Sequence, residues 1–134
     1  MGPDDTEVSC VAPDLGGEIA RWLTHLRSER RLSAKTLEAY ERDLRQFLTF
    51  LSTHWGGRVA AGQFAALTAA DIRAFMASRR SHAIASRSLM RALAGLRSFG
   101  RFLEREGKGK VGALSAIRAP KIGKSLPKPI QMEA

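Results

Sequence analysis

Two long segments of the sequence carry apolar residues at the spacing of an α-helix, and each begins with hydroxyl-bearing and basic residues. The first reads SAKTLEAYERDLRQFLTFL over residues 33–51, and the second reads SRSLMRALAGLRSFGRFLE over residues 86–104. Each apolar stripe is about five turns long, so each helix must bury one face against other elements. A helix N-terminus with cations nearby suits a phosphate group, and two of them on one small chain suggest a clamp on nucleic acid.

The same spacing predicts an all-α fold, a bundle of four main helices without a strand. The predicted helices cover about residues 15–30, 34–53, 69–80 and 86–106. Ser33 is the expected N-cap of the second helix, which the pair Gly56 and Gly57 should end. Thr68 and Asp71 resemble a capping box at the start of the third helix.

The regions outside these helices are expected to be loops and tails. Between the second and third helices we predict a loop, with Phe64 and Leu67 placed against the core. Residues 1–14 are interpreted as a flexible acidic arm, because they contain two prolines and no apolar periodicity. Residues 107–134 are interpreted as a basic linker rich in Gly and Pro, with one helical turn near residues 113–117. A chain that ends on such a linker resembles part of something larger.

The charge of the chain is high and unevenly distributed. Its formal net charge is +9 with a pI near 10.8, which indicates an anionic partner, and nucleic acid is the simplest one. Residues 1–18 hold five acidic residues and no Lys or Arg, so the other residues carry 22 basic residues against eight acids, a net charge of +14. With 44% apolar residues, the stretch 15–106 is long enough for one helical domain with its own core.

Cysteine content and hydropathy favour a cytoplasmic protein. Cys10 is the single cysteine, so no disulfide can form within the chain, as is typical of proteins of a reducing compartment. No apolar run approaches the roughly 20 residues needed to cross a membrane, and the first residues are acidic where a signal peptide would be basic. We therefore expect no membrane partner.

The sequence offers no arrangement of side chains that would support catalysis. Its three histidines, His25, His54 and His82, are far apart and none has a partner at metal-ligand spacing. Tyr40, the one tyrosine, is predicted to lie on or beside the buried stripe of its helix. We expect no catalytic residue, no metal, no cofactor and no small-molecule substrate for this chain.

The fourth predicted helix carries an unmixed cationic face. Helical spacing puts five residues opposite Leu96: Arg87, Arg91, Ser98, Arg101 and Arg105. An ordinary solvated face is one explanation, but solvated faces usually mix charges of both signs, so contact with phosphate or a groove is favoured. Gly100 lies on the apolar side, where its most useful role is to let another helix approach closely.

The second predicted helix has a mixed surface, and its informative part is the first turn. Acidic residues alternate with basic ones along its later turns, which is typical of a solvated, ion-paired surface. Ser33, Lys35 and Thr36 instead offer two hydroxyls and a cation beside the unpaired N–H groups of the helix start. Capping alone would already explain Ser33.

Three helix motifs follow one another in the sequence: KTLxxYxxDLxxF over residues 35–47, LTxxDIxxF over 67–75 and LRSFxxFL over 96–103. A linker with APK at 119–121 and LPK at 126–128 comes after them. In this order and at these separations, the four segments resemble the N-terminal core-binding (SAM-like) domain of the tyrosine recombinases, or phage-integrase family, of the Xer type. The resemblance covers about residues 15–130.

The resemblance implies a four-helix bundle that forms half of a C-shaped clamp and turns its second and fourth helices toward the major groove of double-stranded DNA. The implied DNA-binding residues are Ser33, Lys35, Thr36, Arg87, Ser88 and Arg91. Lys and hydroxyl groups are natural phosphate partners, while Arg91 could reach the edge of a base.

For the whole protein, the resemblance implies a tetramer of paired recombinase subunits on DNA that exchanges strands through a 3′-phosphotyrosyl link. In bacteria this chemistry resolves chromosome dimers at cell division. The catalytic Arg, Lys, His and Tyr of the family belong to the following domain, so this chain is expected to bind DNA without cutting it. Two alternatives remain open: a stand-alone helical DNA-binding regulator, and a protein-interaction module whose basic face meets an acidic partner.

Overall fold

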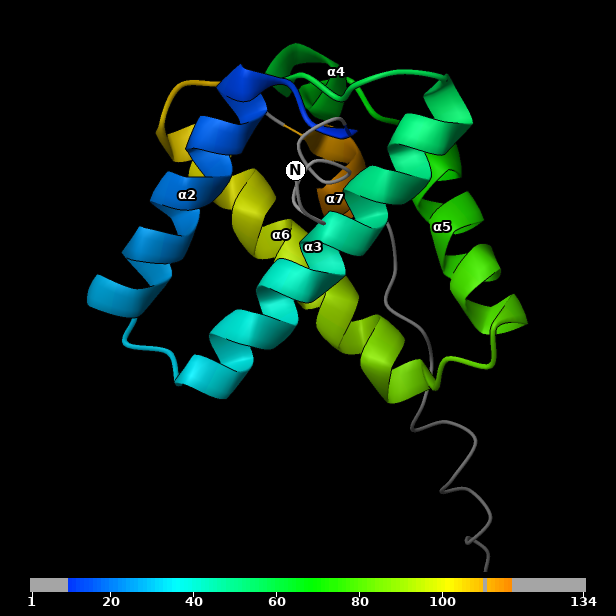
Figure 1. Ribbon diagram of the computed structural model, residues 1–134, viewed down its shortest axis with the longest axis horizontal. Coiled ribbons are helices and arrows are strands. Elements are labelled where there is room, and N and C mark those ends of the chain that lie inside the picture. The colour runs from blue at the N-terminus through cyan, green and yellow to red at the C-terminus, as the bar shows by residue number, and fades with distance from the viewer. Residues whose placement is uncertain (1–9, 110, 117–134) are drawn as a thin grey trace, which may run out of the picture.

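Two helical hairpins make up most of the computed structural model, which describes residues 10–109 and 111–116 (Figure 1). The helices of the described residues are α2 (Pro13–Ser28), α3 (Ala34–Trp55), α4 (Ala61–Ala65), α5 (Ala69–Ser81), α6 (Ser86–Arg105) and α7 (Gly112–Ala116). The long helices α3 and α6 cross at the centre as two diagonals, with α2 on one side and α5 on the other (Figure 1). Both diagonals begin at the lower edge of the view, opposite the edge that holds α4.

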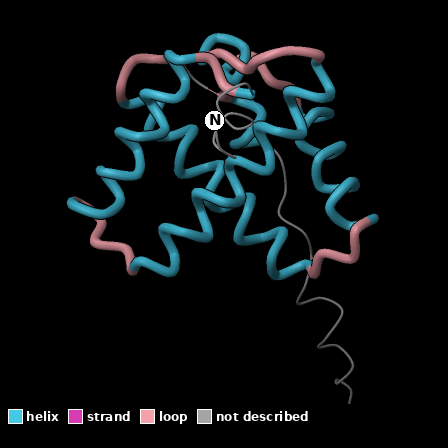
Figure 2. Tube along the Cα trace, viewed as in Figure 1, coloured by secondary structure: helices cyan, strands magenta, loops and turns pink. Residues whose placement is uncertain are grey.

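The all-α prediction is confirmed, and the described residues contain helices and loops but no strand (Figure 2). The four predicted helices are present within about two residues of their expected bounds because local capping fixes their ends. Ser33 Oγ accepts a 3.2 Å hydrogen bond from the Thr36 amide at the start of α3. Gly56 ends that helix in the left-handed conformation, with φ of 80°. Within the part of the chain that the structure describes, no helix could span a membrane.

The predicted capping box at α5 is also present. Thr68 Oγ1 accepts a 3.2 Å hydrogen bond from the Asp71 amide, and the Thr68 amide donates a 2.9 Å hydrogen bond to Asp71 Oδ2. The two residues therefore satisfy two of the amide groups that a helix start leaves unpaired. The aspartate performs the role that Glu or Gln has in most capping boxes.

A chain of aromatic rings links five helices in the core. Trp22 of α2 packs on Phe99 of α6, with ring centres 5.2 Å apart, and Phe99 packs on Phe64 of α4 at 5.3 Å. Phe47 of α3 then contacts Phe64 at 6.1 Å and Phe75 of α5 at 4.9 Å. These rings are buried, so the crossing of α3 and α6 is held by one continuous apolar cluster.

The region between α3 and α5 contains a short helix where a loop was predicted. Phe64 and Leu67 are buried there, as expected, but α4 brings Phe64 to the core. The Ala60 amide at the start of α4 donates a 2.9 Å hydrogen bond to Gln63 Oε1, and the Ala61 amide donates a 3.3 Å hydrogen bond to Asp14 Oδ1 of α2. Five residues are too few for an apolar periodicity, so the sequence pattern could not indicate this helix.

The folded part begins earlier than the predicted arm of residues 1–14 would allow. The buried Val11 forms a parallel bridge with Val59, where the Val59 amide donates to Cys10 O and the Ala12 amide donates to Val59 O, both at 2.9 Å. Helix α2 then begins at Pro13, whose fixed φ suits a first helical turn. Residues 10–14 therefore belong to the helical domain, while residues 1–9 lie outside the described residues.

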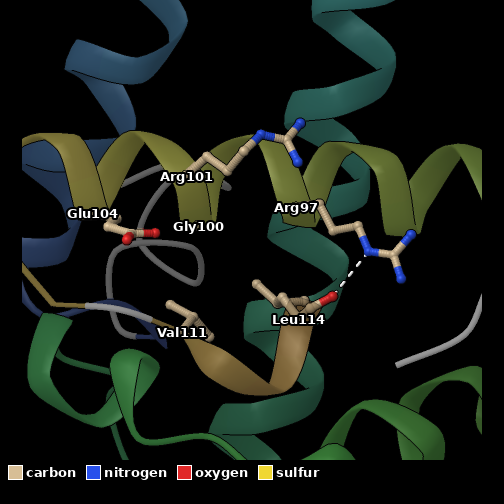
Figure 3. Close-up of a pocket in the computed structure, with 6 residues that line it drawn as sticks. All are labelled: Arg97, Gly100, Arg101, Glu104, Val111 and Leu114. Atoms are coloured by element: carbon tan, nitrogen blue, oxygen red, sulfur yellow. Dashed lines mark hydrogen bonds between the residues drawn. The ribbon is translucent and has the colours of Figure 1, made fainter. Parts of the chain in front are cut away.

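The folded part also extends beyond the predicted boundary at residue 106. Val111 and Leu114 are buried against α6, and Figure 3 shows both side chains pointing toward the turn that holds Gly100. A Cβ atom at Gly100 would lie 2.9 Å from Leu114 Cδ1, which confirms that this glycine allows a close approach. The predicted helical turn near residues 113–117 is α7, whereas residues 110 and 117–134 of the predicted linker lie outside the described residues.

Candidate nucleic-acid interface

The starts of α3 and α6 share one backbone conformation. Arg31 and Ala83, each two residues before the N-cap, have positive φ of 53° and 63°. The N-cap residues Ser33 and Ala85 are both extended, with φ and ψ of −65° and 157° for Ser33 and −66° and 153° for Ala85. Each hairpin thus turns from one helix into the next in the same way, and each turn lies at the lower edge in Figure 1.

The sequences of the two helix starts match as well. Residues 32–37 read LSAKTL and residues 84–89 read IASRSL, so an apolar residue precedes each N-cap and a leucine ends each motif. A basic residue, Lys35 or Arg87, occupies the second position of each helix, and a hydroxyl-bearing residue follows it. The sequence analysis noted hydroxyl-bearing and basic residues at both helix starts, but not that the two motifs match position by position.

The two helix starts differ in their caps. Ser33 Oγ accepts from the Thr36 amide and donates a 3.1 Å hydrogen bond to Thr36 Oγ1. Ala85, at the equivalent position of α6, has no side chain that could cap the helix. The Ser88 amide therefore lacks the side-chain acceptor that the Thr36 amide has. Such an unpaired amide at a helix start donates its hydrogen bond to water or to an anion.

Five of the six predicted DNA-binding residues lie at these two helix starts, one in each hairpin of the fold. Ser33, Lys35 and Arg87 are exposed, whereas Thr36 and Ser88 are half-buried. The structure thus brings all of them to one edge of the molecule, where α3 and α6 begin (Figure 1). Among the described residues no ion pair involves Lys35 or Arg87, so their charges are not balanced within that part of the chain.

Arg91, the sixth predicted residue, is paired with a carboxylate of α3. Its Nε lies 2.8 Å from Asp43 Oδ2 and its Nη2 lies 3.0 Å from Asp43 Oδ1. The Asp43 side chain is only 5% exposed, whereas that of Arg91 is 40% exposed. The hydrogen bonds to Asp43 raise the pKa of Arg91 above its ordinary value, against a smaller opposing effect of burial, so the guanidinium remains charged.

The other residues of the cationic face predicted for α6 have different environments. Ser98 Oγ accepts a 3.1 Å hydrogen bond from Trp22 Nε1 in the core, and Arg105 Nη2 lies 3.2 Å from His25 Nε2. Arg101 is exposed, on the half of the helix that runs away from the lower edge. The predicted continuous stripe is therefore wrong as a single surface, because the helix crosses the bundle centre and its neighbours cover different faces along its length.

Other basic residues extend the cationic edge. Arg27, Arg30 and Arg31 are exposed at the end of α2 and in the connection to α3, and Arg80 is exposed near the end of α5. Analysis of the sequence did not assign them a role, although the run RSERR over residues 27–31 is a visible signal. Together they add positive charge on either side of the two helix starts.

A surface pocket lies between α6 and α7, at the other half of the molecule. It is lined by Arg97, Gly100, Arg101, Glu104, Val111 and Leu114 (Figure 3). Arg97 Nε donates a 2.9 Å hydrogen bond to the carbonyl oxygen of Leu114 and thereby holds the last turn of α7. The lining mixes both signs of charge and serves to fasten α7. Within residues 10–109 and 111–116 no three His, Cys, Asp or Glu side chains are grouped as metal ligands would be.

Several known proteins with similar sequences have one name in common. A chain from Bradyrhizobium diazoefficiens named "Tyrosine recombinase XerC" is 71% identical over 126 residues, which are 94% of this chain and 39% of that protein. A protein of the same name from Nitrobacter winogradskyi is 68% identical over the same shares of both chains. Another, from Methylobacterium nodulans, is 53% identical over 92% of this chain and 38% of its own length.

The chain thus spans about two fifths of the length of these curated relatives. No solved structure matches it. Residues 19–107, which include α3, α5 and α6 and most of α2, match the family described as "Phage integrase, N-terminal SAM-like domain". With the all-helical fold and relatives of this identity, the chain belongs to the phage integrase N-terminal SAM-like domain family.

Proposed function

We propose that this domain binds double-stranded DNA as the gripping part of a site-specific tyrosine recombinase of the XerC kind. The observation that carries the proposal is the placement of two equivalent helix starts, each with an exposed cation that has no ion pair among the described residues, at one edge of the molecule. Phosphate groups bind well at helix starts next to cations. The names of the relatives support the proposal independently.

In the proposed complex, α3 and α6 enter or flank the major groove with their first turns. Lys35 and Arg87 bind phosphates, with Ser33, Thr36 and Ser88 as further hydroxyl donors at the same two turns. Arg91, farther along α6, reaches a base edge. The basic residues of the α2–α3 connection add attraction to the DNA backbone without sequence preference.

For the longer protein, we propose the activity that the relatives' name describes. Paired recombinase subunits would form a tetramer on DNA and exchange strands through a phosphotyrosyl link, with the catalytic residues supplied by a domain other than this one. Resolution of chromosome dimers at cell division is the proposed role, in the cytoplasm at the nucleoid. Support comes from the family match and from the identity to proteins named XerC.

The test is a fluorescence anisotropy titration of a labelled 30-bp duplex at several salt concentrations. Each phosphate contact should contribute a slope of about −0.9 in a plot of log binding constant against log salt. The double variant Lys35→Ala/Arg87→Ala should lose affinity and about two such contacts. The matched control is Arg58→Ala/Arg101→Ala, which removes the same charge from exposed positions away from the helix starts and should leave the slope nearly unchanged.

Absence of duplex binding by the wild-type chain at low salt would exclude the proposal. Equal losses in the two double variants would show that total charge, rather than this edge, determines binding. A protein-interaction module would give a third pattern, in which an acidic protein competes for the chain and the duplex does not.

A further inference from the structure

The Asp43–Arg91 pair joins α3 to α6 beside a contact between Tyr40 and Gly95. On α3, Tyr40 precedes Asp43 by about one turn, and on α6, Gly95 follows Arg91 by about one turn. A Cβ atom at Gly95 would lie 3.2 Å from Tyr40 Cδ1, so the missing side chain leaves room for the Tyr40 ring against α6. The ring of Trp22 stacks on Tyr40, with centres 6.3 Å apart. The position of Asp43 relative to α6 is therefore fixed by rigid neighbours.

The geometry of the pair leaves one recognition edge of Arg91 unused by Asp43. A guanidinium has five N–H donors and can form a two-bond contact either through Nε and one Nη or through its two Nη atoms. Asp43 occupies the edge of Nε and Nη2. The opposite edge, formed by Nη1 and the second hydrogen of Nη2, has the fork that matches O6 and N7 of guanine.

The two partners differ in their exposure to solvent. The Asp43 carboxylate is almost fully covered, while Arg91 is 40% exposed. The carboxylate is thus covered, whereas part of the Arg91 side chain remains accessible to a ligand. A flexible arginine side chain loses conformational freedom when it binds a base, and this loss costs free energy. An arginine that a buried carboxylate already holds in place has lost that freedom before binding.

Arg91 differs from the other cations of this surface because a carboxylate neutralises its charge. The pair with Asp43 is neutral overall, so it gains little from general attraction to phosphates. Lys35 and Arg87 have no ion pair among the described residues and are suited to that attraction. The two kinds of cation therefore fit two tasks: unpaired cations to hold the backbone, and a paired, oriented one to distinguish bases.

We propose that Asp43 is a positioning residue that aims Arg91 at a base edge, guanine fitting best, and thereby sets part of the sequence preference of this domain. The inference rests on the proposed DNA binding, and it adds a residue that does not itself contact DNA. The mechanism requires only that the carboxylate hold the Nε and Nη2 edge while the other edge meets the base.

The test compares Asp43→Asn with Glu41→Gln in the same chain. Glu41 also lies on α3 and pairs with an arginine, Arg45, at 3.0 Å, so both variants remove one negative charge from an ion pair of the same helix. A preferred site is first selected by the wild-type chain from a pool of randomised duplexes. For each protein, the measured quantity is the ratio of affinities for that site and for a scrambled duplex.

Glu41→Gln should change both affinities by the same factor and leave the ratio unchanged. Asp43→Asn should lower the ratio about tenfold, the usual value of one good bidentate base contact, while its affinity for the scrambled duplex equals that of Glu41→Gln. Loss of preference should be confined to one or two base positions in a reselected pool. A loss of affinity for both duplexes would indicate unfolding instead, and circular dichroism would identify it.

Arg91→Lys decides the matter if Asp43→Asn fails to fold, because lysine can still pair with Asp43 but has no fork. It should lose preference at the same base positions, and the double variant should lose no more than either single one. An unchanged ratio in Asp43→Asn or in Arg91→Lys would overturn the inference. Duplex binding without sequence preference by the wild-type chain would also overturn the inference, but the proposed DNA binding would then stand. Failure of the wild-type chain to bind any duplex would exclude both the inference and the proposed function.

Discussion

Trp22 of α2 donates its indole N–H to the hydroxyl of Ser98 on α6, with Nε1 and Oγ 3.1 Å apart. The indole ring is fully buried, so this hydrogen bond satisfies a donor that water cannot reach. The contact joins residues 76 positions apart in the sequence and holds the first hairpin against the second. Ser98 is thus a residue of the contact between α2 and α6, although helical spacing alone placed it on the face opposite Leu96.

We expect Ser98→Ala to lower the free energy of unfolding by about 1–3 kcal/mol, the usual cost of a buried donor without a partner. Chemical denaturation followed by circular dichroism measures this change. Thr53→Ala, at an exposed position of α3, is the control and should change stability by less than about 0.5 kcal/mol. Equal stability of Ser98→Ala and wild type would mean that another acceptor reaches the indole.

The different caps of α3 and α6 predict stability changes of opposite sign at equivalent positions. Ser33→Ala removes the acceptor of the Thr36 amide and should destabilise the domain by about 1 kcal/mol. Ala85→Ser introduces a hydroxyl at an N-cap with the same φ and ψ and should stabilise it by about 0.5–1 kcal/mol. Thermal denaturation of both variants checks the pair, and changes of equal sign would contradict the equivalence of the two turns.

Replacement of Arg91 by Ala should reduce stability as well as DNA binding. Asp43 would be left in a covered site without the two hydrogen bonds that now satisfy it, at a cost of about 1–3 kcal/mol. The double variant Asp43→Ala/Arg91→Ala should recover part of this loss, because no buried charge then remains unpaired. A double variant no more stable than Arg91→Ala alone would contradict this account.

The pH dependence of this pair follows from its arginine. A group whose pKa is raised on folding contributes stability that is present below its unfolded pKa and is lost as the pH rises through the folded value. Since the pKa of Arg91 is raised from an already alkaline value, its contribution should be constant between about pH 6 and pH 9. Denaturation of wild type and Arg91→Ala across that range checks this, and their difference in stability should not vary.

The fold was largely predictable because its signals are local. The stripes of α3 and α6 and the caps at Ser33 and Thr68 depend only on nearby residues, so the main helices were located within a few positions. The pairing of Val11 with Val59 and the docking of Leu114 on Gly100 depend on segments that meet only after folding. Those contacts extend the domain at both ends. Gly100 indicated a close approach, but no local pattern identifies the segments that meet.

The candidate site was predictable to a smaller degree, for the same physical reason. Exposed cations at helix starts can be identified from a sequence, and Lys35 and Arg87 lie where the pattern put them. Whether an arginine is already paired depends on the crossing of helices, and Asp43 is 48 positions from Arg91. Helical spacing also assigns one opposite face to the whole of α6, whereas the central helix has different neighbours along its length.

Because the starts of α3 and α6 are equivalent, Lys35 and Arg87 should contribute equally to DNA binding. Each single change to Ala should reduce the salt dependence of binding by about 0.9 in log–log slope, and the double variant by about 1.8. The preference for one duplex over another should stay constant, because contacts with phosphates carry no sequence information. Arg101→Ala, on the far half of α6, should change the slope little. A large change in slope for one of these two variants and none for the other would show that only one of the two helix starts contacts the duplex.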